Sequence, residues 1–147
     1  MTDTVSSEKR SSIMRQVKSK NTRLELLIRS ALHKSGYRFR IHQKHLPGNP
    51  DIVLRKYNSV VQVRGCFWHG HDCKRARIPK SNDAYWKDKI WKNKVRDQAN
   101  DQKLVSEGWT VIVLWECSIS TNEKRIECLD RLRRAISKYS SPTIVTL

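Results

Sequence analysis

The chain has 147 residues, 37% hydrophobic and 30% charged, which is enough for one domain with a buried core. Thirty Lys and Arg against fourteen Asp and Glu give a net charge of +16, spread along the whole chain, and this indicates a polyanionic partner. No apolar run approaches the roughly 20 residues of a membrane span, and the polar first residues do not resemble a signal peptide. We therefore expect a cytoplasmic, nucleic-acid-binding protein, for which a ribosomal-type RNA binder is one alternative.

Residues 1–21 are predicted to form a basic arm that DNA could order. Its apolar positions after Val5 are Ile13, Met14 and Val17, spaced like one side of a short helical turn. A helix is then predicted from Thr22 to about residue 35, because apolar residues recur there at helical spacing and a glycine follows. The apolar stripe consists of Leu24, Leu27, Ile28, Ala31 and Leu32.

Three strands are predicted next. Residues 37–42 alternate between polar and apolar side chains, and residues 46–50 are punctuated by Pro and Gly. Residues 51–54 and 59–63 read as two strands of a hairpin joined by a turn at residues 56–58. This hairpin leads directly into a segment rich in Cys and His.

The remaining chain reads as helix, strand, helix and tail. Pro79 excludes a helix until about residue 82, and from there to residue 107 the chain predicts a long, polar helix, with a solvated or phosphate-contacting surface. Residues 109–115 are apolar on both faces, which is typical of a central strand covered by helices on both sides. A last helix is predicted over residues 122–138, before a tail at residues 139–147. The order predicts an α/β domain with a mixed sheet and flanking helices.

The segment after the hairpin, with the sequence GCFWHGHDC, concentrates possible metal ligands. With one later cysteine, it supplies the sulfur and nitrogen donors of a closed tetrahedral zinc site. The candidate ligands are Cys66, His71, Cys73 and Cys117. The Cys-x4-His-x-Cys spacing is not that of a standard zinc finger, and free buried thiols are the alternative interpretation. His33, His42 and His45 lack partner ligands in the sequence and are predicted to be surface residues.

Pro50 and Asp51 open one predicted strand, and Gln62, Val63 and Arg64 end the next. This layout is used by nucleases of the PD-(D/E)xK superfamily, in which a carboxylate, a second acid, a backbone carbonyl and a cation converge. Phosphodiester hydrolysis uses a divalent ion to polarise the phosphate and activate a water, so a carboxylate at a strand end is the minimum requirement. Taken alone, a Pro-Asp pair at a strand start is also ordinary turn chemistry.

Together with the GCFWHGHDC run, these residues make the chain resemble the very-short-patch-repair mismatch endonucleases. The resemblance extends from about residue 11 to residue 117 and includes the segments LPG with Pro50-Asp51, Gly108-Trp109, and Trp115-Glu116-Cys117. It implies a restriction-endonuclease-like core over residues 22–138, with a structural zinc.

The resemblance also implies an activity. The enzymes of this family nick one strand 5′ to the T of a T:G mismatch that arises when 5-methylcytosine deaminates. A C5-cytosine DNA methyltransferase would then be the functional partner, and other mismatch-repair proteins are candidate partners. We expect a monomer associated with a bacterial nucleoid.

Carried over to this sequence, the resemblance implies that Asp51 binds Mg²⁺ with help from the main-chain carbonyl of Val63. His69 would take the proton of the attacking water, and Glu25 would orient His69. Two alternatives stay open. Thr22-x-x-Glu25 is also a capping box that would tie down a helix start, and His69 could be a fifth zinc ligand, although four other residues already fill a closed site.

Phe67 and Trp68 lie inside the loop that zinc would close, and the resemblance implies that they wedge beside the mismatch from the major groove. Met14 on the arm would enter from the minor groove. Unstacking a base step costs about a few kcal/mol, and a mismatch costs less to open, so this insertion would favour weakened pairs. Without the resemblance, Met14 would be read as an ordinary surface or core methionine.

Two positions depart from the family pattern. Related enzymes commonly carry a hydroxyl residue in place of Val63, which matters little if only its carbonyl is a ligand. They carry His or an acid in place of Arg64, which stands where the wider superfamily has its catalytic Lys. Arg64 is therefore a candidate catalytic residue that binds the scissile phosphate, or a charge that repels Mg²⁺. The alternative functions are a zinc-containing nuclease of different DNA specificity and a non-catalytic zinc-stabilised DNA-binding module.

Overall fold

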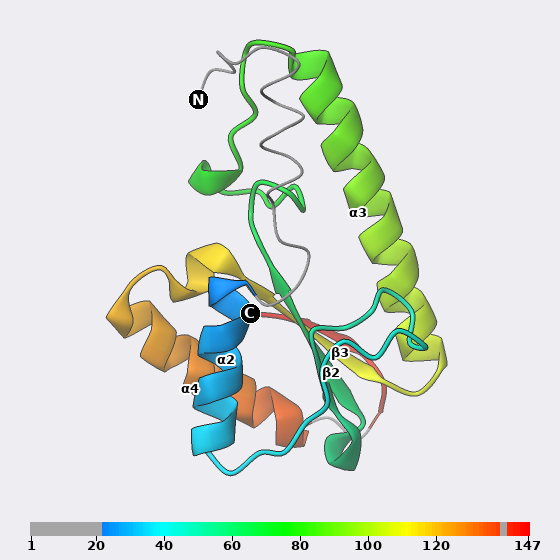
Figure 1. Cartoon of the computed structure of the whole chain (residues 1–147), viewed down its shortest axis with the longest axis vertical. Helices are drawn as coiled ribbons and strands as arrows, with labels where there is room; N and C mark the ends of the chain where they lie inside the picture. Colours follow the sequence, from blue (N-terminus) through cyan, green and yellow to red (C-terminus); the bar gives the residue numbers. More distant parts are fainter. Residues whose placement is uncertain (1–21, 139–140) are drawn as a thin grey trace.

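A computed structural model describes residues 22–138 and 141–147 (Figure 1). This part of the chain forms a mixed α/β fold with three α-helices and four strands. In chain order the elements are α2 (Arg23–Lys34), β1 (Ile52–Leu54), β2 (Ser59–Arg64), α3 (Asp83–Ser106), β3 (Thr110–Trp115), α4 (Asn122–Lys138) and β4 (Ile144–Thr146). The arm at residues 1–21, with Met14, lies outside the described residues.

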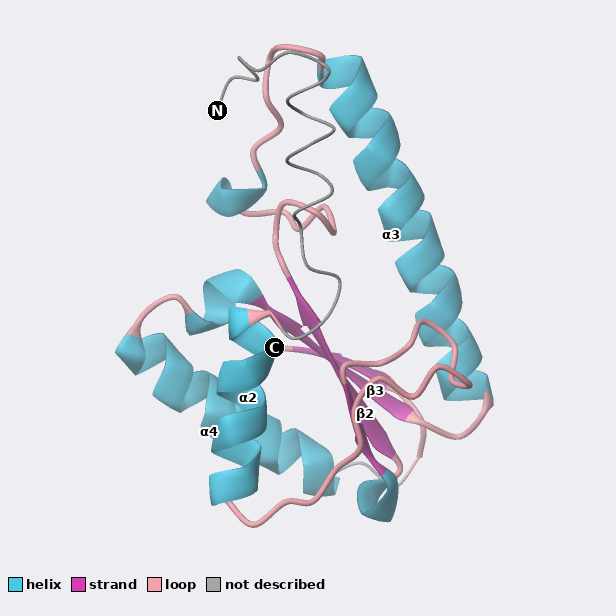
Figure 2. Cartoon of the chain, viewed as in Figure 1, coloured by secondary structure: helices cyan, strands magenta, loops and turns pink. Residues whose placement is uncertain are grey.

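The strands form one sheet in the order β1-β2-β3-β4, seen edge-on in Figure 2. β1 pairs with β2 antiparallel, with Ile52 opposite Val61. β3 pairs parallel with β2 on one side and with β4 on the other. The mixed sheet and the central position of the 109–115 strand are therefore confirmed.

Helices cover both faces of this sheet: α2 and α4 lie together on one face and α3 on the other (Figure 1). The sequence of β3 is apolar throughout because alternate side chains enter two separate cores. Ile112 and Leu114 pack with residues of α2 and α4, whereas Val111 and Val113 pack with Leu104 of α3. None of the described helices has the length and apolar character needed to cross a membrane.

Helix α2 begins as its sequence predicts. Thr22 is the N-cap, and its hydroxyl oxygen accepts a hydrogen bond of 3.2 Å from the backbone N–H of Glu25. Ile28 and Leu32 of the predicted stripe are fully buried, and Leu24 and Leu27 pack at the edge of the same core. The cap fixes where the helix starts and so places Glu25 in its first turn.

Two segments differ from the prediction. Residues 37–42 are not a strand: Tyr37 and Phe39 do pack against the core, but the pairing is limited to one bridge, Arg40 with Val53. The chain then leaves the sheet at His42, whose φ of +49° turns the backbone. In the tail, β4 adds an unforeseen strand beside β3, and Leu147 is buried in the core.

Candidate active site

An open cavity of about 940 Å³ lies where the ends of β1 and β2 meet α2, α3 and the loop after β2. Residues of α2, β2, α3, the loop after β2 and the segment before β1 line it. Those expected from the sequence to be functional are Glu25, Asp51, Val63, Arg64, Phe67, Trp68 and His69. The fold therefore brings seven of the singled-out residues to one place.

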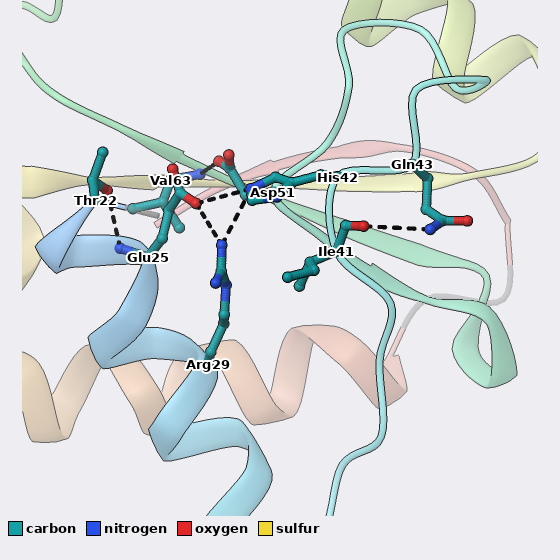
Figure 3. Close-up of polar contacts among 8 residues, drawn as sticks. All are labelled: Thr22, Glu25, Arg29, Ile41, His42, Gln43, Asp51 and Val63. Atoms are coloured by element: carbon teal, nitrogen blue, oxygen red, sulfur yellow. Dashed lines mark hydrogen bonds and ion pairs between the residues drawn. The ribbon is translucent and has the colours of Figure 1, made fainter. Parts of the chain in front are cut away.

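Asp51 stands just before β1, where the antiparallel pairing with β2 brings it close to Val63. The backbone N–H of Val63 donates a hydrogen bond of 2.7 Å to Oδ2 of Asp51 (Figure 3). Burial raises the pKa of Asp51 to about 7, and the nearby Glu25 adds to this effect, although the Val63 N–H and the charge of Arg29 oppose it. The carboxyl group thus lies in a setting that would favour a bound cation.

Glu25 points into the same site from α2 (Figure 3). Its Oε2 accepts a hydrogen bond of 2.7 Å from Nη2 of Arg29 and lies 3.4 Å from Nε2 of His42. The same Arg29 nitrogen lies 3.2 Å from that His42 nitrogen. The prediction that His42 is a surface residue is wrong, because its side chain is only 15% exposed and joins this cluster.

The donor set of this cluster fits a divalent cation. One potential ligand atom from each of Glu25, His42 and Asp51 lies within 4.8 Å of the others. Carboxylate oxygens suit Mg²⁺ and Mn²⁺, and an imidazole suits transition metals. His42 has no partner ligand nearby along the chain, so its place in this cluster cannot be predicted from the sequence.

His69 is held by a carboxylate of helix α3. Its Nδ1 lies 2.5 Å from Oδ2 of Asp97 on α3, and its backbone N–H donates to the carbonyl of Gly65. The expectation that Glu25 orients this ring stays a prediction. Although burial raises it, the pKa of Asp97 is lowered overall by His69 and by the charges of Arg64 and Arg96. An ionised Asp97 can fix the tautomer of the imidazole.

Arg64 also pairs with an acid of α3. Its Nη2 donates to both carboxylate oxygens of Asp101, at 2.8 and 3.0 Å. The two side chains are 10% and 7% exposed, so the pair is buried. The positive charge of Arg64, which the sequence places near Asp51, therefore has a counter-charge in the structure.

The four Cys and His residues expected to bind zinc come together beside this cavity. One donor atom from each of Cys66, His71, Cys73 and Cys117 lies within 4.8 Å of the others. Burial, with hydrogen bonds to the other two thiols, raises the pKa of Cys66 to about 12, although a backbone hydrogen bond of Cys117 opposes this. Three sulfur atoms and one imidazole in this arrangement fit a tetrahedral zinc ion. The imidazole is steadied by stacking on Trp115, with 4.1 Å between the ring centroids.

Comparisons with known proteins identify the family. The family profile of the DNA mismatch endonuclease Vsr matches residues 2–75. The DNA mismatch endonuclease Vsr of Escherichia coli is 36% identical over 124 residues, which are 84% of this chain and 80% of that protein. This chain belongs to the Vsr family.

Two nicking enzymes are also similar to this Vsr-family chain. The type II nicking enzyme V.XorIIP of Xanthomonas oryzae pv. oryzae is 52% identical over 120 residues, covering 82% of this chain and 88% of that one. V.NmeAIP of Neisseria meningitidis serogroup A is 46% identical over 136 residues, covering 92% and 97%. Membership of the Vsr family implies a hydrolase that cleaves DNA.

The aromatic residues of the Vsr-family loop are packed more closely than the sequence suggests. Phe67 and Trp68 are half-buried, and both rings meet Trp86 of α3 edge to face, with centroids 5.5 and 6.1 Å away. Asn93 of α3 donates a hydrogen bond of 2.9 Å to the carbonyl of Trp68. Helix α3 therefore packs against the aromatic residues of the loop, and it also carries the two acids that contact His69 and Arg64.

Proposed function

We propose that this Vsr-family protein nicks one DNA strand 5′ to the T of a T:G mismatch and so begins very short patch repair. The mismatch would be the one left by deamination of 5-methylcytosine, which makes a C5-cytosine DNA methyltransferase the functional partner. Other mismatch-repair proteins would act on the nicked product. One observation supports this proposal best: the carboxylates Glu25 and Asp51, the His69–Asp97 pair and Arg64 all line one cavity.

The same proposal extends to the domain organisation. We assign residues 22–138 to a restriction-endonuclease-like core of the PD-(D/E)xK superfamily, because Asp51 and Val63 meet at the ends of two paired strands. Residues 1–21 would act as a DNA-contacting arm, with Met14 entering the minor groove. Residues 139–147 follow the core as a tail that contributes β4 to the sheet.

Two metals belong to the proposal, and the residues present suit both. Asp51 and the main-chain carbonyl of Val63 would hold Mg²⁺, which when bound polarises the scissile phosphate and lowers the pKa of the attacking water. Glu25 and His42 stand next to this position. Cys66 and the three other ligands of its cluster would hold a structural zinc, which fixes the conformation of the loop.

The side chains of the protein would then have separate tasks. Because Nδ1 of His69 is engaged by Asp97, the other ring nitrogen, Nε2, is the one that can accept a proton from the attacking water. Arg64 carries a positive charge at the cavity, where the scissile phosphate would lie. Phe67 and Trp68 would insert beside the mismatch, at about a few kcal/mol for each unstacked step.

Strand-specific nicking tests the proposal. Duplexes labelled at either 5′ end, containing T:G or T:A in several methyltransferase-type contexts, would be incubated with Mg²⁺ or with EDTA added just before the reaction. The Asp51→Asn variant serves as the catalytic control. We expect cleavage of only the T strand of the T:G duplex, only with Mg²⁺, and none by the variant.

The other outcomes point to the other functions. Equal cutting of T:A and T:G duplexes would reject mismatch specificity and identify a zinc-containing nuclease of different specificity. Salt-sensitive binding without a nick by the wild-type protein would identify a DNA-binding module. Nicking by Asp51→Asn at the wild-type rate would reject the assignment of the catalytic metal to this cavity.

A further inference from the structure

The ion pair between Arg64 and Asp101 joins the end of β2 to the last third of α3, across 37 residues of sequence. Both side chains are almost fully buried. A buried ion pair stabilises a fold weakly, because removing two charges from water offsets much of their attraction, and apolar residues of similar volume often serve as well. The pair therefore calls for a reason besides stability.

The geometry of the Arg64–Asp101 pair suggests a role in binding a phosphate. A guanidinium group has five N–H donors, and in the described part of the chain the side-chain contacts of Arg64 all go through Nη2. The carboxylate of Asp101 thus holds one corner of the group, and the N–H groups on Nε and Nη1 are left for another acceptor. Arg64 lines the same cavity as Asp51 and His69. Each of these N–H groups can donate a charge-assisted hydrogen bond to a non-bridging oxygen of a phosphate.

We infer that Asp101 is a positioning residue, which holds Arg64 so that its guanidinium group binds the scissile phosphate of the DNA. Asp101 acts through Arg64 and does not touch the substrate. It also balances the charge of Arg64, so that a cation can bind at Asp51 while an arginine lines the same cavity. This inference rests on the proposed function, since it assigns a role in the same cleavage reaction.

Single-turnover nicking of the T:G duplex by Asp101→Asn tests the inference. The control is Asp88→Asn, which removes a carboxylate from the exposed Asp88–Lys92 pair of the same helix. We expect Asp101→Asn to slow the nicking step at least tenfold and to change the affinity for the duplex less than twofold. Asp88→Asn should match the wild-type protein. A nicking rate of Asp101→Asn within twofold of wild type would overturn the inference.

A double-mutant cycle distinguishes positioning from a structural role. Arg64→Lys keeps the charge but loses the planar donors, so it should also slow nicking. If Asp101 acts through Arg64, adding Asp101→Asn to Arg64→Lys should cost little more. Independent effects, whose fold-changes multiply in the double variant, would reject the inference.

Asp101→Glu keeps the ion pair but moves it by one methylene, so it extends the test if Asp101→Asn does not fold. Slower nicking by Asp101→Glu at an unchanged unfolding temperature would support positioning, and the wild-type rate would contradict it.

Failure of the proposed function would look different. If the wild-type protein nicked another duplex and spared T:G, only the mismatch assignment would fall, and the same cycle on that duplex would decide the role of Asp101. If the wild-type protein nicked no duplex, the proposed function and this inference would fall together.

Discussion

The raised pKa of Asp51 makes the stability of the magnesium-free protein depend on pH in a predictable direction. The folded state binds a proton at Asp51 more tightly than the unfolded chain does, because the pKa is about 7 in the fold against an ordinary 3.8. The resulting stabilisation is fully present below pH 3.8 and is lost as the pH rises through 7. Replacing Asp51 by Asn removes this titration, so the variant should gain stability relative to wild type as the pH rises.

The magnitude follows from the two pKa values. Each pH unit of difference is worth about 1.4 kcal/mol, so the whole effect is at most about 4 kcal/mol. Between about pH 5.5 and 8.5 the wild-type protein should lose about 2 kcal/mol that the Asp51→Asn variant keeps. The exposed Asp88 provides the control, because Asp88→Asn should follow the wild-type profile.

Urea unfolding of zinc-loaded protein without magnesium, followed by tryptophan fluorescence at several pH values, measures this difference. The difference between the free energies of unfolding of Asp51→Asn and wild type should grow with pH and level off above pH 7. Parallel profiles for the two proteins, with a difference constant to within about 0.5 kcal/mol, would refute the reasoning. Adding Mg²⁺ at about pH 8.5 should stabilise wild type more than the variant.

Three other perturbations have defined outcomes. Asp97→Asn should lower the single-turnover nicking rate at least about 100-fold by releasing the ring of His69, with DNA affinity in a gel-shift assay unchanged; a smaller loss would mean that His69 needs no carboxylate partner. Metal analysis should find one zinc ion per wild-type chain and none in Cys73→Ser, which should also unfold at a lower temperature; full activity of the zinc-free variant would exclude the site. Leu147→Ala should cost about 2 to 3 kcal/mol in urea unfolding, because Leu147 is buried in the core; a cost below about 0.5 kcal/mol would show that the tail adds little.

Local sequence signals predicted the elements that local chemistry determines. The cap at Thr22, the glycine after α3 and the two-sided apolar pattern of β3 each indicated a helix or strand end to within about one or two residues. The grouping of the four Cys and His residues was also foreseeable, even though Cys117 is distant in the sequence, because three thiols and an imidazole are the donors of a tetrahedral zinc site.

Features that depend on distant partners were not foreseeable. Strand β4 has only three residues, and what makes it a strand is the free edge of β3. His42 enters the site through a backbone turn that its neighbours in sequence do not indicate. Asp97 and Asp101 are one helical turn apart on α3, and they share a buried face with Leu104. Such a face cannot be recognised in the sequence of a polar helix, because acids buried in salt bridges are the same residue types as acids in contact with water.

The dependence of the loop after β2 on α3 limits how the loop could be exchanged between relatives. Over its roughly 36 Å length, α3 supplies Asn93 to the carbonyl of Trp68 and Asp97 to the ring of His69. A loop grafted alone into a family member whose helix lacks these two residues would lose both anchors. A chimera that moves the loop and α3 together would carry its supports with it, so the transferable unit runs from the end of β2 to the end of α3.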